Sequence, residues 1–188
     1  MTGRISHVIG FDDAPFERHH RGDVTVIGAV FAGLRLDGVL SGRVRRDGIN
    51  STRMLIDLVQ ASRFRSHLQA VLLQGITLAG FNVVDVHGLS QALDLPVLVV
   101  ARHAPDLQRI RSALLEKVHG GRRKWALIER AGPMETLAGV RVQRVGMDAA
   151  SAEDLIKRLA VNSDVPEPLR TAHIIATGIA DKPSRQRV

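Results

Sequence analysis

The chain has 188 residues, enough for one domain with a buried core, and its apolar share of 45% argues against a disordered chain. It contains no cysteine, which excludes disulfides, thiolate metal sites and cysteine nucleophiles, and aromatic residues make up only 3%. So few aromatics exclude base stacking as the main mode of nucleic-acid binding. The net charge of +7 favours a polyanionic partner, most commonly nucleic acid, although surplus charge also serves solubility.

The first third of the chain predicts three strands, over residues 4–11, 24–31 and 34–45. Ala32-Gly33 is typical of a tight turn between the second and third strands, and Asp37-Gly38 predicts a break within the third. We therefore expect an antiparallel meander at the start of the fold.

The remainder alternates between helical and strand patterns. Helices are expected from Asn50-Ser51-Thr52, over 82–93 with Asn82 as the cap, over 105–118, over 151–159 with a Ser151–Asp154 capping box, and from Pro168. Strands are expected over 69–73, 96–101, 125–128 and 140–145. The sequence thus predicts one α/β domain over 1–180, with three antiparallel strands, then parallel strands, and helices on both faces. Residues 181–188 are polar and are expected to be frayed.

No apolar run of signal-peptide length stands at the N-terminus, and no stretch approaches the roughly 18 apolar residues of a membrane span. We therefore expect a soluble, cytoplasmic protein with no membrane contact.

Several acidic residues stand where chemistry is possible. Asp12-Asp13 follow the first strand and suit a hard cation such as Mg²⁺, although the same pair, with Pro15, also fits an ordinary turn. Asp85 can be a ligand or a helix cap, and Asp47, before Gly48, can be a ligand or a turn residue. Glu167 can pair with Arg170 or deliver an acid to the site from the last helix. His173 lies in an apolar stretch, which favours a hydrogen-bonded core histidine.

Basic residues gather in clusters that can follow a phosphate backbone, each of which also suits a solvated surface. The clusters are Arg18 to Arg21 (which include His19 and His20), Arg43 with Arg45 and Arg46, and Arg122 to Lys124. The loop over 75–82 joins a strand to a helix and offers backbone amides for phosphate. Gln74, at the end of the preceding strand, is neutral and is a poor ligand for a hard cation.

Four blocks, over 9–16, 36–48, 75–85 and 166–173, resemble the endonuclease-V-like family also called endonuclease dU. The first reads Ile-Gly-Phe-Asp-Asp-Ala-Pro-Phe and the third Gly-Ile-Thr-Leu-Ala-Gly-Phe-Asn-Val-Val-Asp. The resemblance implies a ribonuclease-H-like fold and metal-dependent cleavage near deaminated bases such as deoxyuridine or inosine. It implies a metal-ligand Asp at Asp12 or Asp13.

The chain departs from that pattern at several positions. The second ligand Asp falls on Gln74, and the ligand Glu falls near Val44, where Asp47 is the nearest acid. The loop His falls near Gly80, and the wedge Tyr is absent from a chain without tyrosine. These departures leave open whether the site still cuts.

Two hypotheses follow. The first is an Mg²⁺-dependent endonuclease, with Mn²⁺ as an alternative metal, acting on DNA or RNA. Its catalytic residues would be Asp12, Asp13, Asp47 and Asp85, and its metal ligands Asp12, Asp13 and Glu167. Its nucleic-acid contacts would be Arg18, His20, Arg21, Arg43, Arg45, Arg46, Gly75, Gly80 and Asn82. The second hypothesis is a catalytically inactive nucleic-acid-binding or assembly protein on the same fold. The sequence leaves monomer and homodimer both open.

Overall fold

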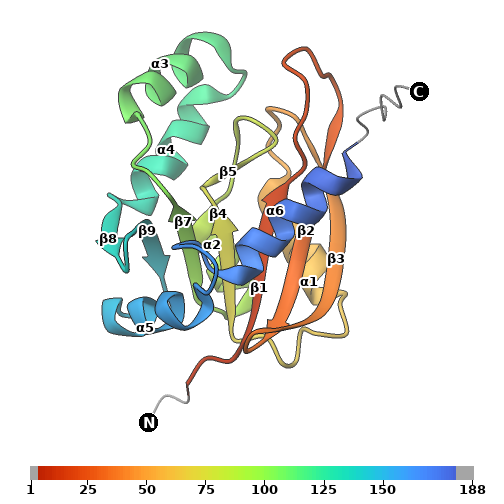
Figure 1. Ribbon diagram of the computed structural model, residues 1–188. Helices are drawn as coiled ribbons and strands as arrows, with labels where there is room; N and C mark the ends of the chain where they lie inside the picture. Colours follow the sequence, from red (N-terminus) through yellow and green to blue (C-terminus); the bar gives the residue numbers. More distant parts are fainter. Residues whose placement is uncertain (1–3, 181–188) are drawn as a thin grey trace, which may run out of the picture.

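The computed structural model describes residues 4–180, and its centre is a seven-stranded sheet in the order β3-β2-β1-β4-β7-β9-β8 (Figure 1). The strands of this sheet are β1 His7–Asp13, β2 Asp23–Ala32, β3 Arg35–Arg45, β4 Ala70–Gln74, β7 Val97–Ala101, β8 Glu135–Leu137 and β9 Val140–Val145. A separate small hairpin pairs β5 Thr77–Leu78 with β6 Asn82–Val83. The helices are α1 Ser51–Gln60, α2 Val86–Leu93, α3 Leu107–Lys117, α4 Gly121–Ala131, α5 Ala149–Leu159 and α6 Glu167–Ile179.

The strand directions confirm the predicted mixed sheet. β1, β2 and β3 form an antiparallel meander, and β4 and β7 run parallel to β1. Beyond them, β9 pairs antiparallel with β7 and β8 pairs antiparallel with β9, so the parallel part is shorter than predicted. α6 crosses one face over β1 and β2, and α1 and α2 lie behind the sheet (Figure 1).

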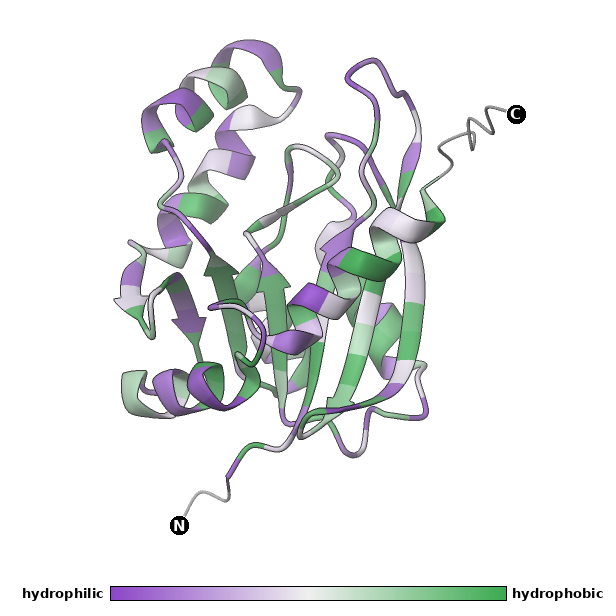
Figure 2. Ribbon diagram, viewed as in Figure 1, coloured by the Kyte–Doolittle hydropathy of each residue, from purple (hydrophilic) through white to green (hydrophobic). Residues whose placement is uncertain are grey.

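The central strands are almost wholly apolar because both of their faces are covered, as the green ribbons of Figure 2 show. Gly10 allows α6 to approach closely, since a Cβ there would stand 2.6 Å from the carbonyl carbon of Pro168. This close packing holds α6 across β1, two residues before the acidic end of that strand.

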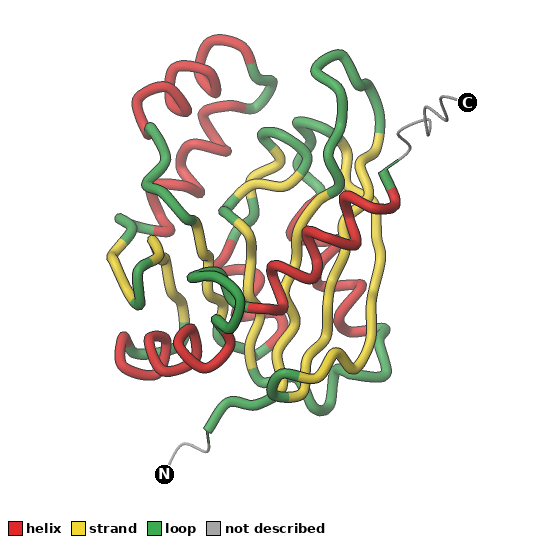
Figure 3. The backbone as a smooth tube through the Cα atoms, in the orientation of Figure 1, coloured by secondary structure: helices red, strands yellow, loops and turns green. Residues whose placement is uncertain are grey.

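Loops gather at the end of the sheet where β1 and β4 finish (Figure 3). They connect β1 to β2, β3 to α1, and β4 to β6. The carboxyl ends of parallel strands are where open α/β sheets place ligands, so this edge is the first place to look for a site.

Some expected elements were wrong. Residues 125–128 belong to helix α4, whose buried positions Gly121, Lys124 and Ile128 recur at helical spacing. Asn82 does not cap α2, because Asp85 does, and Asp148 rather than Ser151 caps α5. The third strand continues through Asp37-Gly38, but its register with β2 shifts there, because Asp37 has no partner in the ladder. The expectation for 181–188 lies outside the described residues. No helix within 4–180 is both long and apolar enough to cross a membrane.

Candidate active site

Asp12 and His173 form a hydrogen-bonded pair at the edge where β1 ends. Asp12 is only 6% exposed, and its Oδ2 lies 2.8 Å from Nδ1 of His173 on α6. Burial raises the pKa of Asp12, and the hydrogen bond from His173 opposes that rise. The His173 side chain is 64% exposed, so the expectation of a core histidine was wrong. The pair thus joins a buried carboxylate to an imidazole that solvent and a ligand can reach.

The helical spacing of α6 explains this placement. Leu169, Ala172 and Ala176 form its buried stripe against the sheet, and His173 lies beside that stripe. From there its ring reaches the end of β1, where it contacts Asp12.

Asp13 faces the other side of the sheet, because neighbouring residues of a strand point to opposite faces. Its Oδ2 accepts a hydrogen bond from the backbone N–H of Ala79 at 3.0 Å. Burial, together with the nearby charge of Asp12, raises the pKa of Asp13 to about 6. Asp13 therefore anchors the loop after β4.

Gln74 lies beside Asp12. β1 and β4 are parallel with Phe11 opposite Leu73, and one further step along this ladder places Gln74 next to Asp12. Residues in register on adjacent strands share a face, so the Gln74 amide and the Asp12 carboxylate point to the same side as His173. Gln74, the neutral residue at which the chain departs from the family pattern, thus stands next to the Asp12–His173 pair.

Asp47 also fixes the loop over 75–81. Its Oδ1 accepts a hydrogen bond from the N–H of Phe81 at 2.8 Å, and its carbonyl accepts one from Nζ of Lys124. Lys124 is only 2% exposed, and burial lowers its pKa. A Cβ at Gly80 would stand 2.5 Å from Oδ1 of Asp47, and the φ of Gly80 is +83°, so this position requires glycine.

These contacts correct the predicted role of the glycine loop. The amides of Ala79 and Phe81 bind the protein's own carboxylates, and the amide of Gly75 bonds to the carbonyl of Val100 at 3.0 Å. These three N–H donors are therefore used within the fold and are not available to phosphate.

Three further predicted site residues have structural roles. Asp85 caps α2 by accepting a hydrogen bond from the N–H of Gly88 at 2.9 Å, on the side of the sheet away from Asp12. Asn82 is fully buried, and its amide bonds to Arg45, Asn50 and Ser51, so it holds loops together. Glu167 pairs with Arg170 at 3.0 Å at the start of α6, and it precedes His173 by six residues on this helix.

The predicted metal-ligand set of Asp12, Asp13 and Glu167 is therefore not assembled. Within 4–180 no group of three or more Asp, Glu, His or Cys side chains could hold a metal ion. Asp12 and the amide oxygen of Gln74 remain as two oxygen donors on one face. This donor set fits a single Mg²⁺ that keeps most of its waters, since Mg²⁺ often binds through one or two carboxylates, and it does not fit a pair of metals.

A basic hollow lies next to this edge. Arg46 organises it: its Nη1 donates to the carbonyls of Arg18 and His20 at 2.7 and 2.6 Å, and its guanidinium stacks on Phe16. Arg46 is thus committed to holding the loop after β1. The residues that line this cavity of about 510 Å³ are His20, Arg21, Gly22, Arg45, Arg46 and Asp47.

Arg43 lies on the same sheet face as Asp12. The ladder joins Asp12 to Ile27 and Ile27 to Ser41, so Ser41 and, two residues on, Arg43 share that face. Arg18, Arg21 and Arg43 are exposed, which leaves their charges available to a polyanion, and Arg45 is exposed but pairs with Asp23 at 3.4 Å.

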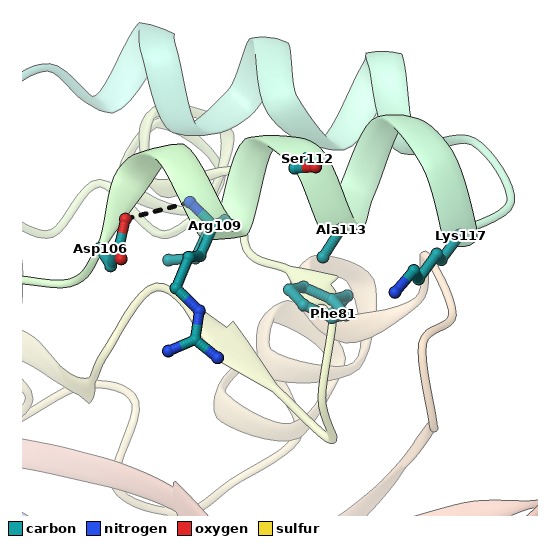
Figure 4. A pocket seen from close by; sticks show the side chains of 7 residues that line it. Phe81, Asp106, Arg109, Ser112, Ala113 and Lys117 are labelled. Atoms are coloured by element: carbon teal, nitrogen blue, oxygen red, sulfur yellow. Dashed lines mark hydrogen bonds between the residues drawn. The ribbon is translucent and has the colours of Figure 1, made fainter.

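A second hollow beneath α3 contains two basic residues that the sequence analysis did not single out. Arg109 and Lys117 flank the ring of Phe81, which comes from the loop that Asp47 holds (Figure 4). Asp106 caps the helix by accepting from the N–H of Arg109 at 3.0 Å. Their spacing of eight residues on one helix was the available signal.

The sheet order and the acidic end of β1 define a ribonuclease-H-like fold, and solved structures bear this out. One of these is Ciona intestinalis endonuclease V in complex with a DNA that contains an inosine followed by a ribo-adenosine. The match covers 90% of this chain and 83% of the Ciona chain, with a TM-score of 0.56 at 13% identity. Human endonuclease V matches over 92% of this chain and 83% of its own, with a TM-score of 0.54 at 20% identity.

The chain belongs to the Endonuclease dU family, whose model matches residues 4–180. A UPF0215 protein of Deinococcus radiodurans is 59% identical over 176 residues, which are 94% of this chain and 90% of that protein. A crystal structure of a protein of unknown function from Archaeoglobus fulgidus is 30% identical, with a TM-score of 0.87 over 94% of this chain and 99% of that one. The resemblance drawn from the sequence blocks is thereby confirmed.

Proposed function

We propose that this protein is an endonuclease that hydrolyses a phosphodiester bond near a deaminated base in DNA or RNA. The observation that carries the proposal is the pair formed by buried Asp12 and exposed His173 at the edge where β1 and β4 end. Membership of the Endonuclease dU family supports the reaction class, and the inosine-containing DNA bound to the Ciona protein supports the kind of substrate.

The pair suits general base catalysis. With Nδ1–H donating to Asp12, the imidazole is held in the tautomer that leaves Nε2 as the proton acceptor. Nε2 takes a proton from a water molecule as the water oxygen bonds to phosphorus. The P–O ester bond then breaks, and the departing oxygen takes a proton from solvent. Asp12 stabilises the imidazolium that forms, in the manner of an orienting carboxylate.

A divalent cation would be held by Asp12 and the amide oxygen of Gln74, the two oxygen donors that share this face. When bound, Mg²⁺ or Mn²⁺ would supply positive charge that stabilises the charge developing on the phosphate. A single carboxylate predicts weak binding, so cleavage should need a high concentration of the ion.

The surrounding basic residues would bind the strand. Arg43 lies on the same face as Asp12, and Arg21 and Arg45 line the adjacent hollow. Arginine on phosphate gives binding that is insensitive to sequence and weakens with salt. Base selection therefore needs a different part of the molecule.

The test uses the full chain with labelled single- and double-stranded oligonucleotides that contain one deoxyuridine, one deoxyinosine or no lesion. Cleavage is followed on denaturing gels with Mg²⁺, with Mn²⁺ and with EDTA. We expect lesion-dependent cleavage that His173→Gln reduces about 100-fold or more. His119→Gln, at an exposed histidine on another element, is the matched control and should cut normally. Intact substrates under every condition would refute the proposal.

A second function, binding without cleavage, is favoured by the neutral Gln74 beside Asp12. The substitution Gln74→Asp separates the two, because it adds a carboxylate on the face that holds Asp12. If the native protein binds but does not cut and Gln74→Asp cuts with Mg²⁺, the native protein is a binding protein disabled at this position.

A further inference from the structure

Arg170 lies one helical turn before His173, on the same side of α6. Residues three apart on a helix are neighbours, with Cβ atoms about 5–6 Å apart. His173 contacts Asp12 on β1, and α6 also contacts β4, the strand that ends at Gln74 (Figure 1). Arg170 therefore stands beside the reaction edge, where β1 and β4 end, although the sequence analysis considered it only as a partner for Glu167.

A buried carboxylate fixes the guanidinium of Arg170. Glu167 is 8% exposed, and both of its oxygens accept hydrogen bonds from Nε of Arg170, each at 3.0 Å. Nδ2 of Asn162, in the loop before α6, donates to Oε1 of Glu167 at 2.9 Å and anchors the carboxylate to that loop. The hydrogen bond from Arg170, more than those from Asn162, lowers the pKa of Glu167. Glu167 thus stays ionised while it orients the arginine.

The outer end of Arg170 is left unused by the fold. A guanidinium has five N–H donors, and Nε–H is the only one that Arg170 gives to an acceptor within residues 4–180. Nη1 and Nη2 are not among the buried unpartnered atoms of that part of the chain, and the side chain is 34% exposed, so solvent reaches them. Four N–H groups in a planar fork are therefore available to a ligand.

Other half-buried arginines use their terminal nitrogens inside the protein. Nη atoms donate to backbone carbonyls in Arg46, Arg65, Arg141 and Arg144. An arginine that only pairs with a carboxylate commonly uses two N–H groups, one for each oxygen. In Arg170 one N–H serves both oxygens. This arrangement holds the arginine in place and leaves its fork for an anion.

A phosphodiester fits these donors. Its two nonbridging oxygens match the planar fork of a guanidinium, which binds phosphate through two parallel N–H···O bonds. A phosphate on Arg170 would lie within reach of the water that His173 activates, because the two residues are neighbours on α6. We propose that Arg170 binds the nonbridging oxygens of the phosphodiester that this water attacks, and that Glu167 is its positioning residue. The contact to phosphate follows from the donors of Arg170, whereas its part in cleavage rests on the proposed function.

A fixed positive charge has a particular value at this edge, because neutral Gln74 leaves Asp12 as the carboxylate beside it. A divalent ion held by one carboxylate binds weakly. Arg170 brings its charge without an ion, and it stabilises the negative charge on the phosphate oxygens during attack.

The test removes the charge of one phosphate at a time and needs no cleavage. The full-length protein in EDTA is titrated with the strand from the cleavage test that it binds most tightly. Copies of that strand carry one uncharged methylphosphonate each, at successive positions around the lesion, and fluorescence anisotropy follows binding. We expect one position at which the methylphosphonate weakens binding of the native protein about tenfold or more, because a hydrogen bond between charged groups is lost there.

Three variants assign this position to Arg170 and Glu167. In Arg170→Gln the same methylphosphonate should weaken binding by about twofold or less, because the partner of the missing oxygen is already gone. Arg170→Lys keeps the charge and lacks the fork, so the effect should be intermediate. Glu167→Gln leaves the charge of Arg170 and loosens its Nε, so the effect should again be intermediate.

Arg158→Gln is the matched control, because Arg158 pairs in the same way at the opposite end of the sheet. Its Nε donates to Oδ2 of Asp154 at 2.7 Å, four residues before it on α5. It also lines a hollow with Gln69 and Pro96, which precede β4 and β7. The substitution removes the same charge as Arg170→Gln and should keep the full effect of the methylphosphonate.

The absence of any such position in the native protein would overturn the proposal. An undiminished effect in either Arg170→Gln or Arg170→Lys would overturn it as well, so poor folding of one variant leaves the other to decide. An undiminished effect in Glu167→Gln would overturn the positioning role.

The cleavage assay separates this inference from the proposed function. Arg170→Gln should lower the single-turnover rate of cleavage about 100-fold, the usual cost of removing one donor to developing charge. A native protein that binds phosphate through Arg170 and cuts no strand contradicts the proposed function alone. A native protein that cuts, with Arg170→Gln equally fast, contradicts this inference alone.

Discussion

Replacing Asp13 with asparagine should stabilise the metal-free protein at neutral pH. The pKa of Asp13 is raised from 3.8 to about 6 by burial and by Asp12, so between these two pH values the folded state holds a proton that the unfolded state has lost. The stability from this proton is fully present below about pH 4 and is lost as the pH rises through 6. A rise of about two pKa units corresponds to about 3 kcal/mol at pH 7.

Asparagine removes the charge and keeps an oxygen that can accept from the N–H of Ala79. The free energies of unfolding of Asp13→Asn and the native protein should therefore be similar at pH 4. Toward pH 7 they should diverge by roughly 2–3 kcal/mol in favour of the variant. Urea unfolding in EDTA between pH 4 and 7.5 measures this difference.

Asp94→Asn is the matched control, because Asp94 is exposed and its left-handed conformation, with φ of +50°, suits asparagine equally well. Its difference from the native protein gives the baseline for the Asp13→Asn comparison. A difference for Asp13→Asn that is constant across the range, or a variant less stable than the native protein at pH 7, would refute the electrostatic reasoning.

Three further outcomes are expected. Gly80→Ala should lower the free energy of unfolding by about 2 kcal/mol or more in the same urea assay, because its Cβ would clash with Asp47 at a positive φ. Its control is Gly178→Ala, which has open space around it and should be neutral or stabilising. In fluorescence-anisotropy binding at several salt concentrations, Arg43→Ser should reduce the slope of log K against log salt by about 1, and Arg53→Ser, on α1, should leave it unchanged. Mg²⁺ should raise the melting temperature of the native protein more at pH 8 than at pH 5, because protons compete with the ion for Asp12, whose pKa is raised. Asp12→Asn should abolish this rise in melting temperature.

The sequence was sufficient for most strands of the sheet and for the position of Asp12 at the end of β1. Long β-branched runs separated by turn residues predicted the meander, and buried apolar runs predicted β4 and β7. The sequence analysis grouped Asp12 with Asp13 as metal ligands and did not use the alternation of side chains along a strand. Two consecutive strand residues point to opposite faces, so they are poorly placed to share one ion.

Other features depended on tertiary packing. The run Trp-Ala-Leu-Ile at 125–128 suits a strand as well as a helix, and its helical period became visible only with Lys124 counted among the buried positions. A buried lysine is rare, and here the carbonyl of Asp47 compensates it from a distant loop. An apolar cavity lined by Gln143 arises only where β9 meets the α3–α4 segment, which no local pattern encodes.

The loop over 75–81 connects these observations. Asp13 and Asp47 each bind one of its amides, so two acids that the sequence analysis offered as catalytic residues position the loop. One end of the loop follows Gln74 at the edge that holds Asp12 and His173, and Phe81 near its other end forms a wall of the cavity. A rigid loop in this place can hold the reaction edge and the cavity at a fixed separation. Neutral Gln74 stands at the β4 end of this loop, on the face that holds Asp12 and His173.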